Sequence, residues 1–266
     1  MKALGTLWIG ERLSEIELAS LHSFVALGHD ITVYSYAPIT NLPPQIKAGD
    51  AAAVMPARAI LVYKDKRKPS PALHANLFRY AMIAQTGKVW VDLDILALRP
   101  FAFASDHVFG LERPDSVNNA VLGLPPSSPT LADLLRFRPD TRGIAPHITG
   151  LRRVKYWIKS LGRGYPIDRW AWGSTGPKAL TIYLRQHGEF AQSLPVEAFY
   201  PVGVHDHAQL LEPGRLDYGS FGAGTYCIHL WGSRIRDTMR KQHDGRAPAG
   251  SLLDLAFRRA GAAGFL

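Results

Sequence analysis

Cysteine is almost absent from this chain of 266 residues, in which Cys227 is the only one. A single thiol excludes an internal disulfide and a thiolate metal cluster, and it is typical of a reducing compartment. No apolar run reaches the roughly 18–20 residues that a membrane-spanning helix needs. The opening MKALGTLWIGERLSE places Glu11 too early for the apolar core of a signal peptide. We therefore expect a cytoplasmic protein without a membrane span.

Acidic residues are also scarce, with 22 Asp and Glu against 31 Lys and Arg, which gives a net charge of +9. Much of the excess lies in residues 136–169, where nine Lys or Arg face two Asp. Such a surface attracts nucleic acid, anionic lipid or phosphorylated substrates, although its commonest meaning is a solvated face. The hydrophobic content of 47% is that of a folded protein, and the length suits one large domain.

The first 36 residues predict a strand, a helix and a second strand, an order typical of a parallel β-α-β unit. The helix has roughly helical apolar spacing and ends at Gly28, which suits a helix C-terminus. Further along, a loop rich in Pro and Ala is expected at residues 37–57, followed by an apolar run at 57–63. Helices are expected at 71–87 and 173–188, and a strand followed by a helix at 119–137. The pattern at 226–234 predicts a late strand followed by a polar loop.

The stretch VWVDLDILALRP, residues 89–100, puts two like charges into an apolar, β-branched run. Side chains two residues apart in a strand point to the same side, so Asp92 and Asp94 are expected to converge. Two carboxylates that face one point favour a bound cation. The alternative is that either Asp ends the strand in a turn. In open α/β sheets the carboxyl ends of strands border the ligand site, and strand ends here would also carry Trp8 and Tyr34.

The segment HANLFRYAMIAQTGKVWVDLDILALRPF, residues 74–101, resembles the DXD region of glycosyltransferases with a GT-A fold. It is most similar to bacterial enzymes of the family-32 type and their relatives, the α-1,4-glycosyltransferases and the clostridial glucosylating toxins. The sequence departs from the family pattern at Ala75-Asn76, where the family has Ser-Asp, and at Lys88, where it has a second Gly. The matching positions are Arg79, Tyr80, Gly87, Trp90, Asp92, Asp94 and Pro100-Phe101.

Four shorter stretches extend the resemblance in the expected order: LWIG, TGPKALT, FYPV and IHLWGSR. The resemblance implies an α/β fold of the GT-A type, Rossmann-like, with a mostly parallel central sheet flanked by helices in a single domain. Residues 1–101 would form the nucleotide-sugar-binding half with the DXD motif. Residues 102–266 would form the acceptor-binding half with a C-terminal closing segment.

The implied activity is a metal-dependent, retaining transfer of a hexose from a nucleotide diphosphate sugar to a hydroxyl of a glycan or glycolipid. A UDP-sugar is favoured as the donor, a GDP-sugar is the second choice, and nucleic acid is not expected as a partner. A hard divalent cation, Mn²⁺ or Mg²⁺, bridges carboxylate and phosphate oxygens well. Asp92, Asp94 and Arg79 would be catalytic, and His229 would join both Asp residues as a metal ligand. Donor contacts are expected from Trp8, Tyr34, Ser35, Asn76, Arg79, Trp90, Asn119, Trp231 and Ser233.

Several of these residues have a simpler interpretation. His229 and Trp8 could belong to the core, and the pair Asn118-Asn119 could make a turn. The cluster HDH, residues 205–207, lacks a third ligand at suitable spacing and is not expected to bind metal. The run KDKRK, residues 64–68, is expected to be a solvated loop.

Two other functions remain open. One is a Mg²⁺-dependent phosphatase or phosphotransferase of the haloacid-dehalogenase type, which also carries Asp-x-Asp at a strand end. That motif requires Thr or Val where this chain has Leu96. The other is a non-enzymatic, basic module that binds lipid or nucleic acid, for which the Asp pair would have no role.

The segment GLRRVKYWIKSLGRGYPIDRW, residues 150–170, combines cations with an apolar stripe. Val154, Trp157, Ile158 and Leu161 recur at helical spacing between Arg and Lys residues. A stripe of this kind either packs into the core or lies on an anionic membrane surface. The second alternative predicts peripheral, salt-sensitive binding at the inner membrane face.

Overall fold

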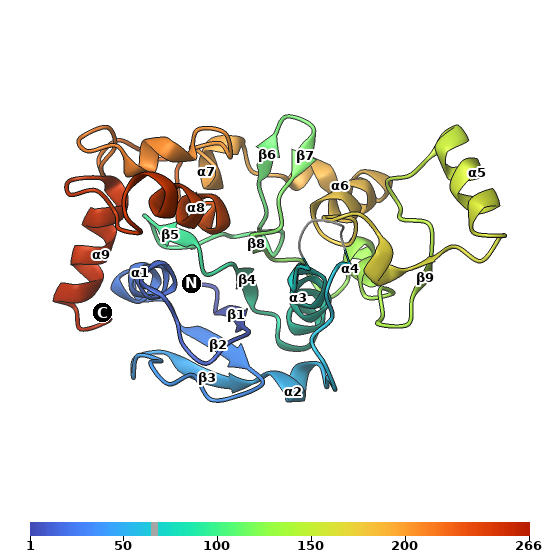
Figure 1. Cartoon of the computed structure of the whole chain (residues 1–266), viewed down its shortest axis with the longest axis horizontal. Coiled ribbons are helices and arrows are strands. Elements are labelled where there is room, and N and C mark those ends of the chain that lie inside the picture. Colours follow the sequence, from blue (N-terminus) through green and yellow to red (C-terminus); the bar gives the residue numbers. More distant parts are fainter. Residues whose placement is uncertain (65–68) are drawn as a thin grey trace.

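The computed structural model describes residues 1–64 and 69–266, and its first elements form the predicted β-α-β unit (Figure 1). These elements are β1 (Leu4–Trp8), α1 (Glu15–Ala26) and β2 (Ile31–Ser35). β1 and β2 are parallel, with Trp8 opposite Ser35. Helix α1 begins after Ser14, whose backbone N–H donates to the Glu17 side chain at 2.9 Å. It ends before Gly28, whose φ of 78° suits glycine.

The central sheet has the strand order β3-β2-β1-β4-β8. Its remaining strands are β3 (Lys47–Asp50), β4 (Val89–Val91) and β8 (Val121–Leu122). Only β8 is antiparallel, so the sheet is mixed and mostly parallel. The order reverses between β1 and β4, because β1 leads outward to β2 and β3 while β4 lies on its other side. A reversal of this kind opens a crevice at the carboxyl ends of the two strands.

Both faces of the sheet are buried, each by its own group of helices (Figure 1). The first apolar cluster joins one face to α1, α8 (Gly232–Gln242) and α9 (Leu252–Ala262). The second joins the other face to α3 (Ala72–Thr86), α4 (Pro129–Leu134) and α6 (Pro177–Gln186). Residues from before and after position 101 contribute to both clusters, so the chain forms a single domain.

The prediction of a plain loop for residues 37–57 was wrong. The segment rich in Pro and Ala contains β3 and α2 (Ala51–Val54) instead of a plain loop. The apolar run 57–63, all of it described, forms no strand, and its Tyr63 makes only an isolated bridge with Ser70. Of the run 64–68, residues 65–68 lie outside the described residues.

The second half adds short paired strands and small helices around the sheet. A helix, α8, directly follows the late strand β11, so the polar loop expected there was wrong. Where the chain is described, no helix has the length and apolar character to cross a membrane. The remaining elements are β5 (Ile95–Ala97) paired with β11 (Cys227–His229), β6 (Leu111–Arg113) with β7 (Ser116–Val117), β9 (Arg142–Gly143) with β10 (Tyr165–Pro166), α5 (Gly150–Lys159), α7 (Val196–Phe199), and the 3₁₀ helices η1 (Ile167–Arg169), η2 (Glu189–Gln192) and η3 (His207–Leu211).

Two serines of α1 fix β5, the strand that follows the Asp pair. Ser20 donates its hydroxyl to the Ile95 carbonyl at 2.7 Å. The Ala97 N–H donates to the Ser23 hydroxyl at 2.9 Å. Both bonds are buried, so they hold one edge of the turn that carries the carboxylates.

Replacing Ser23 with Ala should leave the Ala97 N–H buried without its acceptor. We expect the free energy of unfolding to fall by about 1–3 kcal/mol, as measured by urea denaturation. The control is Ser127→Ala in an exposed turn, which should change stability by no more than about 0.5 kcal/mol. Equal effects of the two substitutions would show that the Ser23 bond does not hold β5.

Candidate functional site

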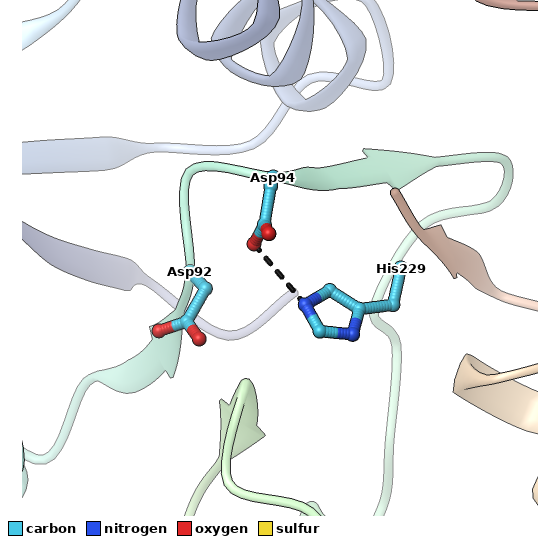
Figure 2. Close-up of side chains that lie close together, drawn as sticks. All are labelled: Asp92, Asp94 and His229. Carbon is cyan, nitrogen blue, oxygen red and sulfur yellow. Dashed lines mark ion pairs between the residues drawn. The ribbon is translucent and has the colours of Figure 1, made fainter. Parts of the chain in front are cut away.

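The turn between β4 and β5 brings Asp92 and Asp94 together (Figure 2). Strand β4 ends at Val91, and the Ile95 N–H donates to the Asp92 carbonyl at 3.3 Å. The predicted convergence is therefore correct, but its predicted cause was wrong. The two side chains meet because the chain turns after β4, and strand alternation does not extend through them.

His229 completes the group from the other end of the sequence. It is the last residue of β11 and pairs with Ile95 of β5, which places it beside the turn. Its Nε2 lies 3.2 Å from Asp94 Oδ1 (Figure 2). One ligand atom from each of the three residues lies within 4.8 Å of the others. A divalent ion with bonds of about 2.0–2.6 Å can bridge ligands at this separation.

The donor set suits a hard divalent cation. It offers two carboxylates, which are the ligands that Mn²⁺ and Mg²⁺ prefer, and one imidazole. Over residues 1–64 and 69–266 it is the sole group of three or more His, Cys, Asp or Glu with metal-binding geometry. The expectation that a metal could bind here therefore fits the residues present. The other ring nitrogen of His229, Nδ1, is buried and has no partner among the described residues.

Asp94 is held in its charged form. The Gly232 N–H at the start of α8 donates to Asp94 Oδ2 at 2.7 Å, where the helix dipole also favours negative charge. Burial alone would raise the pKa of Asp94, but the charge of His229, its hydrogen bond and the Gly232 N–H lower it to about 2. Burial opposes the charged form of His229 as well, yet Asp94 raises the pKa of that imidazole.

An unusual backbone conformation and close packing allow the contact between Gly232 and Asp94. Trp231, which links β11 to α8, has φ 54° and ψ 51°, a left-handed conformation that is unusual for a bulky residue. A Cβ on Gly232 would lie 3.0 Å from Asp94 Oδ2 and 3.1 Å from Arg236 Nη1. The left-handed residue and the glycine together let the start of α8 approach the carboxylate.

Asp92 has different partners. Arg79 of α3 donates from Nη2 at 2.7 Å and Trp90 donates from Nε1 at 2.6 Å, both to Oδ1. Even so, burial and the charge of Asp94 raise the pKa of Asp92, against the lowering effect of Arg79. Burial is the largest of these effects, and a cation between the carboxylates would favour ionised Asp92.

A buried network locks Arg79 in place. Its Nη1 donates to Asn76 Oδ1 at 2.7 Å, and its guanidinium lies 4.5 Å from the centre of the Trp90 ring. Asn119 also donates to Asn76 Oδ1, at 3.0 Å, and Asn76 donates to Thr175 Oγ1 at 3.2 Å. Asn76 and Asn119 thus position Asp92 through Arg79, and Trp90 does so directly. Their contacts with a donor stay predictions.

A pocket of about 180 Å³ opens beside the carboxylates at the ends of β1 and β4. Trp8 lines it from β1, and Arg236 lines it from α8. Arg236 pairs with the buried Glu17 of α1. Sequence reasoning missed both residues, although Ser14-x-x-Glu17 is a helix-start pattern and Arg236 follows Gly232 by one helical turn.

The other expected donor residues are scattered. Ser35 lies opposite Trp8 at the end of β2, and Ser233 is exposed in the first turn of α8. Tyr34 was wrongly assigned to the donor site, because alternation turns it to the opposite face, where it packs on Phe78. Trp231 is buried, and its Nε1 donates to the Val202 carbonyl at 2.9 Å, so it supports His229 from behind.

Two minor clusters take the simpler interpretation. His207 of the HDH cluster lies near the Val204 carbonyl and the Thr238 hydroxyl, at 2.8 Å and 3.0 Å, both within hydrogen-bond distance. Asn118 accepts from the Ala120 N–H at 2.8 Å and donates to Glu112 at 2.9 Å. His207 therefore links the start of η3 to α8, and Asn118 stabilises a local chain turn.

No model of a known protein family matches this chain, and no curated protein matches its sequence at a significant level. The resemblance to DXD glycosyltransferases therefore stays a prediction from the motifs.

Replacing Arg79 with Met should leave Asp92 without its guanidinium, and Asn76 Oδ1 would keep only Asn119 of its two donors. We expect the free energy of unfolding to fall by about 3 kcal/mol, because one partner of a largely buried ion pair is removed. The double variant Arg79→Met/Asp92→Asn should recover part of this loss. Arg258→Met, which breaks a pair on an exposed helix surface, should cost under about 1 kcal/mol. Chemical denaturation measures the loss of stability in each variant. Equal losses from Arg79→Met and Arg258→Met would contradict the role of Arg79.

Proposed function

We propose that this protein is a metal-dependent glycosyltransferase that moves a hexose from a nucleotide diphosphate sugar to a hydroxyl of a glycan or glycolipid. One observation carries the proposal. The Asp92, Asp94 and His229 group borders a pocket at the reversal of strand order, with Trp8 on one wall and Arg236 on another. The proposed fold is of the GT-A type, with the described mixed sheet as its Rossmann-like part.

The chemistry of the pocket suits a nucleoside diphosphate. A bound Mn²⁺ or Mg²⁺ would stabilise the negative charge of the leaving diphosphate. Asp92, Asp94 and His229 would hold this ion. Arg236 is partly exposed and adds a fixed positive charge on the pocket wall, and Ser233 is exposed in the first turn of the same helix. Trp8 offers its aromatic face to a nucleobase.

Among the described residues, each carboxylate that lines the pocket already has a basic partner. Asp92 pairs with Arg79, Asp94 with His229, and Glu17 with Arg236. The rate increase would therefore come from positioning of donor and acceptor and from leaving-group stabilisation. Attack on the same face as departure fits this arrangement and would retain the anomeric configuration.

The sequence argues against the phosphatase alternative. A dehalogenase-type motif requires Thr or Val where this chain has Leu96. A screen of nucleotide sugars for metal-dependent hydrolysis, beside p-nitrophenyl phosphate, separates the two activities. Turnover of the aryl phosphate alone would favour the phosphatase.

Replacing Asp94 with Ala should abolish metal-assisted donor binding and transfer while the protein stays folded. The carboxylate is the shared neighbour of His229 and Gly232, so its loss removes a central ligand. Calorimetry of UDP and GDP with and without Mn²⁺ measures the effect. Asp140→Ala, an exposed carboxylate outside the pocket, is the control and should bind as wild type does. The proposal is wrong if Asp94→Ala binds UDP or GDP with undiminished Mn²⁺ dependence.

Replacing Trp8 with Ala should weaken the nucleotide by roughly tenfold or more, because a stacked base gains about 1–3 kcal/mol from an aromatic face. The indole Nε1 of Trp8 is buried and unpartnered among the described residues, so the ring is held by its contacts alone. Trp157→Ala, on α5 far from β1, is the matched control (Figure 1). If Trp8→Ala lowers stability but keeps nucleotide affinity, Trp8 belongs to the core.

A further inference from the structure

Residues 142–166 form an arm that leaves the body of the protein and returns to it. Strands β9 and β10 pair at its base, with Gly143 opposite Tyr165, and α5 lies between them. Gly164 has φ 64° and lies against the Gly143 backbone, so glycine is required where the two ends meet. Figure 1 shows α5 at the edge of the molecule, away from the central sheet.

The apolar stripe of this arm faces water, so the first of its two alternatives, packing into the core, is wrong. Not one residue of α5 is buried. Leu151 is 89% exposed, Ile158 67% and Leu161 87%. Val154 and Trp157 are also more than half exposed. The side of α5 that meets the arm's base carries Tyr156, whose ring contacts Tyr165 edge-on at 5.8 Å.

The concentration of apolar surface here is unusual for the molecule. Five of the nine large hydrophobic residues that are exposed among the described residues lie between positions 151 and 161. An apolar patch of this kind on a folded chain commonly marks an interaction surface.

The charge of the arm identifies the kind of partner. Residues 142–166 hold six Lys or Arg and no carboxylate. Those on α5 and just after it, Arg152, Arg153, Lys155, Lys159 and Arg163, are all exposed. Two copies of such a face repel each other, which disfavours self-association. Nucleic acid would satisfy the cations but would leave the aliphatic stripe in water.

We propose that the arm docks on an anionic membrane surface, with α5 lying in the plane of the interface. The aliphatic side chains and Trp157 would enter the region below the headgroups, and the flanking cations would face anionic lipid. This surface requires neither the metal group nor the pocket, so the inference goes beyond the proposed function and does not rest on it.

Flotation with phosphatidylglycerol vesicles, without metal or nucleotide, tests the proposal. At low salt the wild-type protein should float with these vesicles, and added salt should release it. It should not float with phosphatidylcholine vesicles. Ile158→Ser should lower the partition coefficient between vesicles and water roughly tenfold, because an aliphatic side chain no longer enters the interface. Arg152→Gln should lower it roughly fivefold through the loss of one cation near the headgroups.

Matched controls lie outside the arm. Leu266→Ser removes an aliphatic side chain that is 48% exposed at the C-terminus, and Arg215→Gln removes an exposed cation in the loop after η3. Both should leave flotation unchanged. The proposal is overturned if wild type does not float, or if the controls lose as much binding as the arm variants. It is also overturned if Ile158→Ser instead dissolves a dimer seen by ultracentrifugation.

Discussion

The repulsion between Asp92 and Asp94 is the constraint around which the site is built. Two carboxylates at the end of a buried strand are costly unless positive charge and hydrogen-bond donors surround them. The chain supplies these from opposite sides. Arg79 and Trp90 reach Asp92 from the face covered by α3, while His229 and Gly232 reach Asp94 from the face covered by α8. The carboxylates therefore join the two halves of the chain.

This arrangement explains why so much of the polar network is buried behind the pocket. Asn76, Asn119 and Thr175 form the hydrogen-bond network that fixes the guanidinium of Arg79, which in turn pairs with Asp92. A group that must hold one geometry needs such support, because a loose side chain would lose precision at the site. On the other wall of the pocket, Glu17 holds Arg236 in a similar way through their ion pair.

The site and the arm differ in what they bury and what they expose. The site gathers charge into a half-buried pocket, where low polarity strengthens each interaction. The arm exposes apolar side chains and cations together, which is favourable only against a surface that is both apolar and anionic. The two features lie on different elements, so one can be altered without disturbing the other.

Local features of the fold were predictable from the sequence, and long-range ones were not. Helical spacing and Gly87 indicated the helix that carries Arg79, and the β-α-β unit followed from its strand and helix patterns. Strand β3 escaped prediction because KAGD has no β-branched residue and becomes a strand only by pairing with β2. Tyr34 was misplaced because strand position alone does not show which face meets the pocket.

The sequence by itself indicated two residues that could bind a metal, since Asp-x-Asp puts two carboxylates two residues apart at the end of an apolar run. Tertiary structure alone decided that His229 joins them, because only the pairing of β5 with β11 brings it there. It also decided the environment of α5. An amphipathic stripe has the same periodicity whether it packs inward or faces water, so only the folded arm shows that this one is uncovered.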